Sequence, residues 1–327
     1  MGDYVASPGS IRMGVQLPSI RPTAMWAKAW FVDYDSGSNG NVVANDPGTP
    51  LKTLTGALSA AARGDVIYLR PRPYSGTDPQ GILDNAVVPV AKGGIAIIGT
   101  GVQLRNPFDM QVKGAAAGAI LTVRAPMVTI ENICFNRGSG TIAHIKAESS
   151  STDATKRGWG LNVFNCHFRN SNALAGAGGA IFLDNVWHVE INGCVFIACA
   201  TGINATATVD SIHDVNILNC QFLSAASTAG DTAADIDCHV YMNVLSRGVL
   251  IDNCRFCGPV PTGLASAVRS RYMDLTGCLV GMVSNCFFND TSLTFGAAGS
   301  GAFIPTTVGI VNCYQEGANN ASPLVRT

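Results

Sequence analysis

A phrase of eight residues occurs seven times in this chain, and it constrains the fold more than any other feature. Each copy has alternating aliphatic residues, then Asn or once Gly, usually Cys, and then an aromatic residue. The copies begin at Val128, Leu161, Val189, Val215, Val249, Gly281 and Val308. In six copies the cysteines align, at positions 26 to 34 residues apart, and every insertion falls between copies. Such a period is typical of a solenoid, in which each repeat contacts only its neighbours.

The repeated unit consists of strands. It combines Val/Ile alternation with turn residues and lacks the 3.6-residue periodicity of helical repeats. We therefore predict an all-β fold, a single-stranded right-handed parallel β-helix. Val66–Leu69 and Ile95–Ile98 supply two earlier rungs. With them the solenoid has about nine coils, and at ~4.8 Å per coil it forms a rod ~40 Å long.

Each position in the phrase has an expected structural role. The Val and Ile side chains face the core, and the Asn stands at a bend where the left-handed conformation is required. Stacked Asn amides can hydrogen-bond from coil to coil. The Cys and Phe side chains then point inward again. Because a position repeated in every coil is architectural, we expect no metal and no cofactor at these residues.

The eleven cysteines favour buried thiols over disulfides. Their number is odd, and six of them occupy one repeated position, namely Cys166, Cys194, Cys220, Cys254, Cys286 and Cys313. A row of equivalent positions inside a coil suits small apolar side chains.

The repeated phrase resembles that of the pectin-lyase-like β-helix superfamily, which includes polysaccharide lyases, hydrolases and many bacteriophage tailspikes. The resemblance covers the chain from about Trp30 onward. Leu51, Leu54 and Leu58 lie on one helical face, and they predict a short helix with Thr49 as N-cap, Pro50 in the first turn and Gly64 at the end. The resemblance implies that a strand at Trp30–Asp33 and this helix close the first coil. It does not fix the activity, because one fold hosts many functions.

We predict one domain with four segments. They are an extended N-terminal arm (1–29), an initial strand, loop and capping helix (30–65), the parallel β-helix (66–315) and a C-terminal tail (316–327). The arm holds apolar residues at strand-like spacing: Ile11, Met13, Val15, Leu17 and Ile20. They predict either an anchor that docks onto another virion protein or a disordered end.

Composition limits the choice of partners. Charged residues make up 13% of the chain and the formal net charge is −1, which gives no electrostatic reason to expect nucleic acid. The N-terminal segment has neither the apolar run of a signal peptide nor a membrane span. We therefore expect no membrane insertion and predict a location in a virion that is assembled in the bacterial cytoplasm.

The outward positions beside each Asn predict a subunit contact. Several carry apolar side chains, which would line one outer face of the rod: Phe164, Leu218, Leu250, Met282 and Val311. A contiguous apolar column marks an interface. We therefore predict a homotrimer, as in similar phage spikes.

The best candidate for a catalytic or sugar-binding site is the segment around Asp237. Strand alternation places Asp235, Asp237 and His239 on the outer face, and the cysteine spacing brings Arg269 beside Asp237 and Arg271 beside His239. The same residues could instead form a surface ion pair between coils, worth about 0–1 kcal/mol.

Two weaker clusters lie at expected turns, where Asp and His commonly serve local hydrogen bonding. They are Asp184, His188 and Glu190, and Asp210, His213 and Asp214. The four tryptophans, at positions 26, 30, 159 and 187, are scattered in the sequence, which argues against a saccharide groove.

Two functions remain open. The first is a structural bacteriophage virion protein, either tailspike-like or a decoration protein, with host polysaccharide as a candidate partner. The alternative is a polysaccharide-degrading lyase or glycosidase with the Asp237 region as its active site. A bacterial surface adhesin is disfavoured because no export signal is visible.

Overall fold

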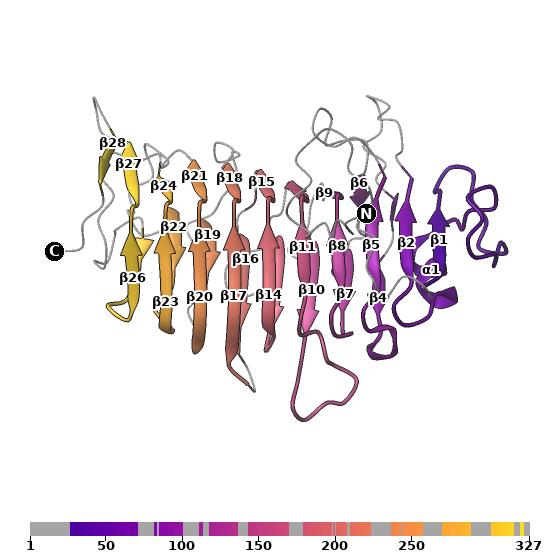
Figure 1. Ribbon diagram of the computed structural model, residues 1–327, viewed down its shortest axis with the longest axis horizontal. Coiled ribbons are helices and arrows are strands. Elements are labelled where there is room, and N and C mark those ends of the chain that lie inside the picture. Colours follow the sequence, from indigo (N-terminus) through magenta and orange to yellow (C-terminus); the bar gives the residue numbers. More distant parts are fainter. Residues whose placement is uncertain are drawn as a thin grey trace, which may run out of the picture.

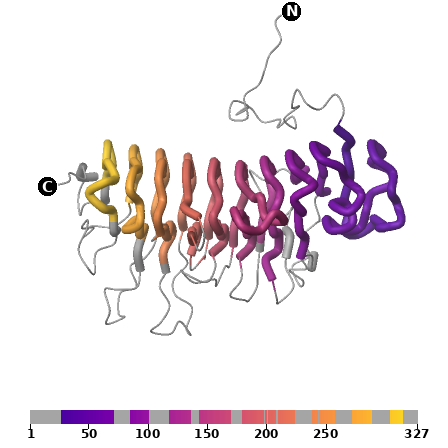
Figure 2. The backbone as a smooth tube through the Cα atoms, turned by 90° about the horizontal axis from the view of Figure 1, so that it is seen from below, coloured from indigo at the N-terminus to yellow at the C-terminus, as the bar shows by residue number. Residues whose placement is uncertain are grey.

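The computed structural model describes residues 27–70, 82–83, 85–100, 111–113, 118–136, 143–169, 179–197, 199, 201–207, 210–223, 237–242, 244–257, 270–288, 302–316 and 321–323. Within these residues, three long sheets wind around one core and run the length of a rod (Figure 1 and Figure 2). Consecutive coils pair in parallel, as β14 pairs with β17 and β17 with β20. The predicted all-β parallel β-helix is therefore confirmed.

The first sheet contains the repeated phrase. Its ten strands are, in order, β1 (Ala29–Val32), β2 (Val66–Leu69), β5 (Ala96–Gly99), β8 (Thr129–Glu131), β11 (Asn162–Phe164), β14 (Trp187–Asn192), β17 (Ile212–Leu218), β20 (Ser246–Asp252), β23 (Cys278–Ser284) and β26 (Val308–Val311). The nine predicted rungs are β2 and the eight strands that follow it. The predicted initial strand, β1, pairs with β2 and is the tenth strand of this sheet.

The other two sheets complete each coil. The second sheet begins after the bend at the Asn of each phrase and contains β3 (Ile82–Leu83), β6 (Gln111–Lys113), β9 (Cys134–Asn136), β12 (His167–Arg169), β15 (Val195–Ile197), β18 (Gln221–Leu223), β21 (Arg255–Cys257), β24 (Phe287–Phe288), β27 (Tyr314–Glu316) and β28 (Ala321–Pro323). The third sheet contains β4 (Ala86–Val88), β7 (Leu121–Val123), β10 (Ile145–Glu148), β13 (Ile181–Asp184), β16 (Thr201–Thr206), β19 (Asp237–Tyr241), β22 (Ser270–Asp274) and β25 (Ala302–Phe303). At the end of the rod, β28 pairs antiparallel with β27.

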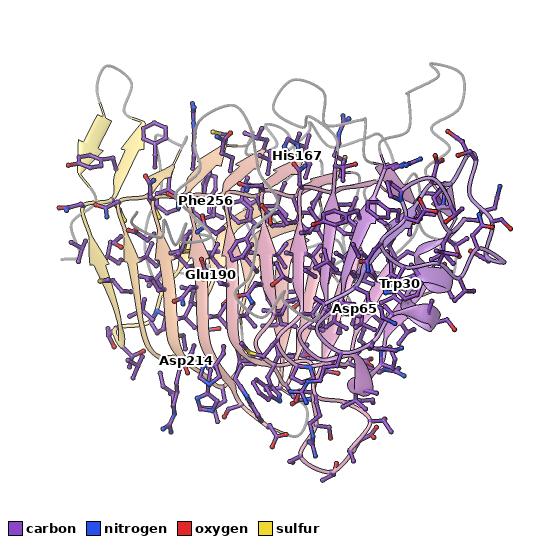
Figure 3. All side chains as sticks on the ribbon, turned by 45° about the vertical axis from the view of Figure 1, so that its right-hand side comes forward. Trp30, Asp65, His167, Glu190, Asp214 and Phe256 are labelled. Carbon is purple, nitrogen blue, oxygen red and sulfur yellow. The ribbon has the colours of Figure 1, made fainter. Side chains whose placement is uncertain are left out.

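The aromatic residues of the phrase form a continuous stack inside the coil. Successive ring centroids are 4.7 to 5.3 Å apart and nearly parallel through Phe135, Phe168, Phe196, Phe222, Phe256 and Phe288. The spacing of the stack follows the ~4.8 Å spacing of the strands. Phe256 lies within the rod in Figure 3.

The cysteines of the phrase form a second internal row. All six are buried, and each thiol donates to backbone carbonyl groups, as Cys220 does to the oxygens of Ile191 (3.6 Å) and Leu218 (3.2 Å). Burial raises the pKa of the Cys194 and Cys220 thiols well above its usual value. Thiols that stay protonated are poor nucleophiles and poor metal ligands, which fits the structural role that their repetition predicts.

The asparagines of the phrase adopt the left-handed conformation, as predicted. Their φ angles lie between 50° and 61° at Asn132, Asn165, Asn219, Asn253, Asn285 and Asn312, and Gly193 has a φ of 66°. The Asn253 amide nitrogen donates to the side-chain oxygen of Asn219 (2.7 Å), one coil away. In two other coils the acceptor is the residue before the bend: Asn219 donates to Asn192, and Asn285 to Asp252.

We expect Asn253→Ala to lower the free energy of unfolding by about 1–2 kcal/mol, because alanine is strained at positive φ and cannot replace the hydrogen bond. Asn253→Gly should cost less, since glycine adopts this conformation without strain. Asn216→Ala, in the outer face of β17, is the matched control. Urea unfolding measures all three, and equal losses for the alanine and glycine variants at 253 would contradict the role given to the backbone.

The N-terminal end of the rod is closed by a short helix, α1 (Leu54–Ala60), which packs against β1, β2 and β4. Its N-cap is Thr53, whose hydroxyl accepts from the backbone N–H of Gly56 (3.0 Å), so the prediction of Thr49 was wrong. Leu51 is not in the helix either, but bridges to Val32. The helix therefore begins later than the leucine spacing indicated. A 3₁₀ turn, η2 (Val90–Lys92), follows β4.

A buried carboxylate fixes the junction between the cap and the first coil. Asp65 is 3% exposed, and its side chain accepts from the indole N–H of Trp30 (2.8 Å) and from the backbone N–H groups of Lys28 and Ala62. Asp65 and Trp30 lie close together at this end of the rod in Figure 3. These hydrogen bonds replace the water that the carboxylate loses on burial, so Asp65 can lie inside the fold.

A second row of left-handed residues lies at the turn that leads from the third sheet into the first. It comprises Gly64, Gly94, Met127, Gly160, His188, Asp214 and Gly248, with φ angles from 51° to 80°. Where the residue is not glycine, its side chain is directed away from the core, since His188 and Asp214 are both exposed. This turn positions the candidate site.

Candidate functional site

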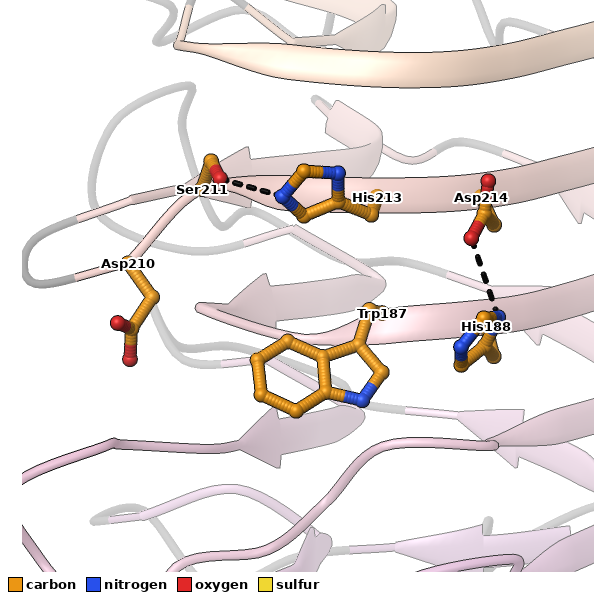
Figure 4. A pocket seen from close by; sticks show the side chains of 6 residues that line it. All are labelled: Trp187, His188, Asp210, Ser211, His213 and Asp214. Atoms are coloured by element: carbon orange, nitrogen blue, oxygen red, sulfur yellow. Dashed lines mark hydrogen bonds and ion pairs between the residues drawn. The ribbon is translucent and has the colours of Figure 1, made fainter.

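A polar hollow lies where β14 and β17 begin (Figure 4). It is open to solvent, has a volume of about 390 Å³, and is lined by Trp187, His188, Asp210, Ser211, His213 and Asp214. Among the described residues, the hollow brings together one partly exposed tryptophan, two imidazoles, two carboxylates and one hydroxyl group. We take it as the candidate functional site.

Strand register places the two sides of the hollow. Trp187, the first residue of β14, is opposite His213 of β17. The next residue in each strand is left-handed, and these two residues face each other with 3.2 Å between His188 Nδ1 and Asp214 Oδ2. Both side chains are more than half exposed, so this pair adds little to stability.

The remaining two residues are held by local hydrogen bonds. The Oγ of Ser211 lies 2.5 Å from Nε2 of His213. Asp210 Oδ2 accepts from the backbone N–H of Ser151 (2.9 Å), which comes from the excursion between β10 and β11, and the Asp210 N–H donates to Asn185 (2.9 Å). The excursion thus reaches over one coil and fixes the carboxylate at the edge of the hollow.

The described residues of the hollow do not form a complete catalytic triad. A serine nucleophile needs a base that is itself oriented by a third group. Ser211 contacts His213, but in the described part of the chain no carboxylate is hydrogen-bonded to that imidazole. Nor do three His, Cys, Asp or Glu side chains of the described residues gather in a way that could hold a metal ion. The hollow offers an indole face with polar groups around it.

The predicted site around Asp237 is not assembled as expected. The register is shifted by one residue, since Asp237 pairs with Ser270 and Cys238 with Arg271. His239 is inside the coil instead of on the outer face: it is 8% exposed and lies against Phe222 (5.5 Å between centroids). The predictions that Arg271 lies beside His239 and that His239 lies on the outer face were therefore wrong. Asp235 and Arg269 lie outside the described residues.

The two weaker clusters are rearranged. Asp184 accepts from its neighbour Asn185 (2.7 Å), and Glu190 accepts from Asn192 (3.1 Å). His188 pairs with Asp214 of the other cluster. The structure thus joins His188 to Asp210, His213 and Asp214, which the sequence had kept apart.

The predicted apolar column is interrupted. Asn162, Glu190, Asn216, Leu250 and Met282 form one outward row, and Phe164, Asn192, Leu218, Asp252, Ser284 and Val311 form another. The five candidate interface residues are therefore divided between two rows. Leu250 and Met282 are neighbours in the first row, whereas polar residues separate Phe164, Leu218 and Val311 in the second. Met282 and Val311 are 42% and 45% exposed, whereas Phe164 is 8% exposed, so the prediction that Phe164 is displayed on the outer face was wrong.

The arm residues Ile11, Met13, Val15, Leu17 and Ile20 lie outside the described residues. In the part of the chain that is described, no helix has the length and apolar character needed to cross a membrane.

Sequence reasoning missed Trp187 and Ser211. The tryptophans looked scattered, yet Trp159 and Trp187 occupy equivalent positions in successive coils, because the N–H of Gly160 donates to the carbonyl oxygen of Trp187 (2.9 Å). A signal was present: Trp159, Trp187, His213 and Arg247 each stand two residues before a copy of the phrase. Extending the repeat upstream by two positions would have aligned them.

The fold and the hollow define a parallel β-helix protein with a polar surface site. No protein-family model matches the sequence, and no curated protein matches it. Solved structures with a similar fold include a pectin methylesterase from Aspergillus niger in deglycosylated form, with 13% identity, 89% of this chain and 86% of that chain covered, and a TM-score of 0.49.

Two further similar structures are a lyase and a viral protein. A rhamnogalacturonan lyase has 13% identity over 91% of this chain and 65% of that one, with a TM-score of 0.43. ORF18 of Geobacillus virus E2 has 11% identity over 80% of this chain and 56% of that one, with a TM-score of 0.35.

Proposed function

We propose that this protein is a glycan-binding β-helix protein that recognises a surface polysaccharide through the hollow at Trp187. The observation that carries the proposal is the partly exposed side chain of Trp187 among hydroxyl, imidazole and carboxylate groups. The apolar face of a pyranose ring packs on an indole, while its hydroxyl groups exchange hydrogen bonds with such side chains. A rigid β-helix holds these groups in fixed positions.

Trp187→Ala is expected to weaken glycan binding by about tenfold or more, since a lost stacking contact of about 1.4 kcal/mol corresponds to that factor. Isothermal titration with a glycan identified on a microarray measures the change. Tyr314→Ala is the control, because Tyr314 is 44% exposed at the far end of the rod. Equal affinity of wild type and the Trp187 variant would contradict the proposal.

The setting that we propose is a virion, where the β-helix would be displayed as a structural protein and the N-terminal arm would bind a neighbouring component. A homotrimer is part of this proposal, supported now by the exposed Met282 and Val311 near the C-terminal end. Light scattering that gives a monomer mass at micromolar concentration would contradict the trimer. Unchanged incorporation of a chain lacking residues 1–29 into particles would contradict the anchor.

Polysaccharide cleavage is the second candidate function, favoured by the presence of Asp210 and Asp214 in one hollow. Glycoside hydrolysis uses a pair of carboxyl groups. Product analysis on capsular and cell-wall polysaccharides separates the candidates: cleavage by wild type that is lost in Asp210→Asn or Asp214→Asn would establish an enzyme at the hollow. Loss of cleavage in Asp237→Ala alone would instead indicate an active site in the segment around Asp237.

A further inference from the structure

Four surface residues lie in one row along the rod, immediately before the left-handed turn in each coil. The row, which we call the axial row, consists of Trp159, Trp187, His213 and Arg247. Trp187 pairs with His213, and His213 with Arg247, in the strand register. Trp159 precedes Gly160, whose N–H donates to the carbonyl oxygen of Trp187 (2.9 Å). The four residues therefore come from four consecutive coils.

The spacing of the axial row suits an extended ligand. Adjacent members are separated by one strand spacing, ~4.8 Å, so the row spans about 15 Å parallel to the helix axis. A pyranose ring in an extended chain has a length similar to one coil. Trp159, Trp187 and His213 are partly exposed, and Arg247 is exposed. Successive sugar rings can thus lie against successive members of the row.

The charged groups beside the row differ in their contacts. Asp214 Oδ2 lies 3.2 Å from His188 Nδ1, and Asp210 accepts from the N–H of Ser151. Among the described residues, by contrast, no carboxylate forms an ion pair with Arg247. An exposed guanidinium group without a carboxylate partner can bind an anionic group through charge-assisted hydrogen bonds.

We propose that the glycan bound at the hollow is an acidic chain, extended along the helix axis over the axial row. Its sugar rings stack on Trp159 and Trp187, and an anionic substituent contacts Arg247. The inference rests on the proposed function, because it takes the hollow as a sugar site and adds the direction of the chain and the chemical class of the ligand.

A glycan microarray with carboxylated, sulfated and neutral chains of increasing length tests the ligand class. Binding confined to acidic chains supports the inference, and the carboxylated and sulfated spots distinguish the two kinds of anion. Binding to neutral chains alone overturns the inference and leaves the proposed function standing. Binding to no chain overturns both.

Variants test the geometry by titration with the best acidic chain and with its neutral counterpart, obtained by carboxyl reduction or desulfation. Arg247→Gln should weaken binding of the acidic chain about tenfold and leave binding of the neutral chain unchanged. Arg63→Gln, at an exposed arginine near the capped end, is the charge control.

Trp159→Ala should weaken the binding of long chains and leave the binding of the shortest chain unaffected. An equal effect of Trp159→Ala on all lengths, or none on any, overturns the axial direction.

Discussion

Phe288→Ala is expected to lower the free energy of unfolding by about 3–5 kcal/mol, the usual cost of removing a phenylalanine ring from a packed core. Phe288 is fully buried and stacks on Phe256 with 5.0 Å between centroids. The edge of the Tyr272 ring meets it at 5.6 Å. Since the backbone ladder fixes the coil spacing, neighbouring rings cannot close the space that the variant leaves.

Phe287→Ala is the matched control, because it removes the same side chain from the adjacent position of the same strand. Phe287 points outward and lies under the guanidinium group of Arg255 at 5.7 Å. Its loss should cost about 1 kcal/mol or less. Chemical denaturation of both variants measures the difference. Similar destabilisation by the two substitutions would contradict the stabilising role given to the internal aromatic stack.

The part of the fold encoded in the phrase was predictable from the sequence. A parallel coil repeats one local structure, so every position of the phrase must satisfy the same demand in each turn of the solenoid. The Asn at the left-handed bend, the inward Cys and the inward Phe follow from that demand. Thr53 was missed as the helix N-cap because Thr49 and Pro50 form an equally good local signal.

The site was harder to predict because it depends on register between coils outside the phrase. Insertions fall between the copies, so the spacing from Cys254 to Cys286 does not carry over to β19 and β22. Val240 pairs with Met273, which is 33 residues on, one more than the cysteine spacing indicates. When the register between two strands shifts by one residue, each side chain comes to lie on the face opposite to the expected one.

The burial of His239 shows a second reason. Strand alternation assumes one inner and one outer face, yet Cys238, His239 and Val240 are all buried, as are the residues from Thr201 to Ala205 of the neighbouring β16. His239 occupies the row that also contains Gly202 and Tyr272. The absence of a side chain at Gly202 leaves room for the Phe222 ring, which a Cβ atom would approach to 3.0 Å. Periodicity in one strand cannot reveal such packing between coils.

Acidification should destabilise the protein through His239. Burial lowers the pKa of this imidazole from 6.5 to about 4, and its ring neighbours are Phe222, Phe256 and Tyr272. Between these pH values the unfolded chain takes up a proton that the folded chain does not, so the free energy of unfolding falls as the pH falls. The full contribution, about 3 kcal/mol, is present above pH 6.5 and is lost as the pH approaches 4.

His239→Phe removes this titration while keeping a ring in the row. Unfolding in urea at pH 7 and pH 4.5 gives the loss of stability for wild type and variant. Carboxylates such as Glu148, whose pKa is lowered by Lys146 and Arg124 against the effect of burial, contribute equally to both proteins and cancel in the comparison. The variant should therefore lose about 2–3 kcal/mol less than wild type. Equal losses for wild type and His239→Phe would show that the buried imidazole is not the group that makes the coil sensitive to acid.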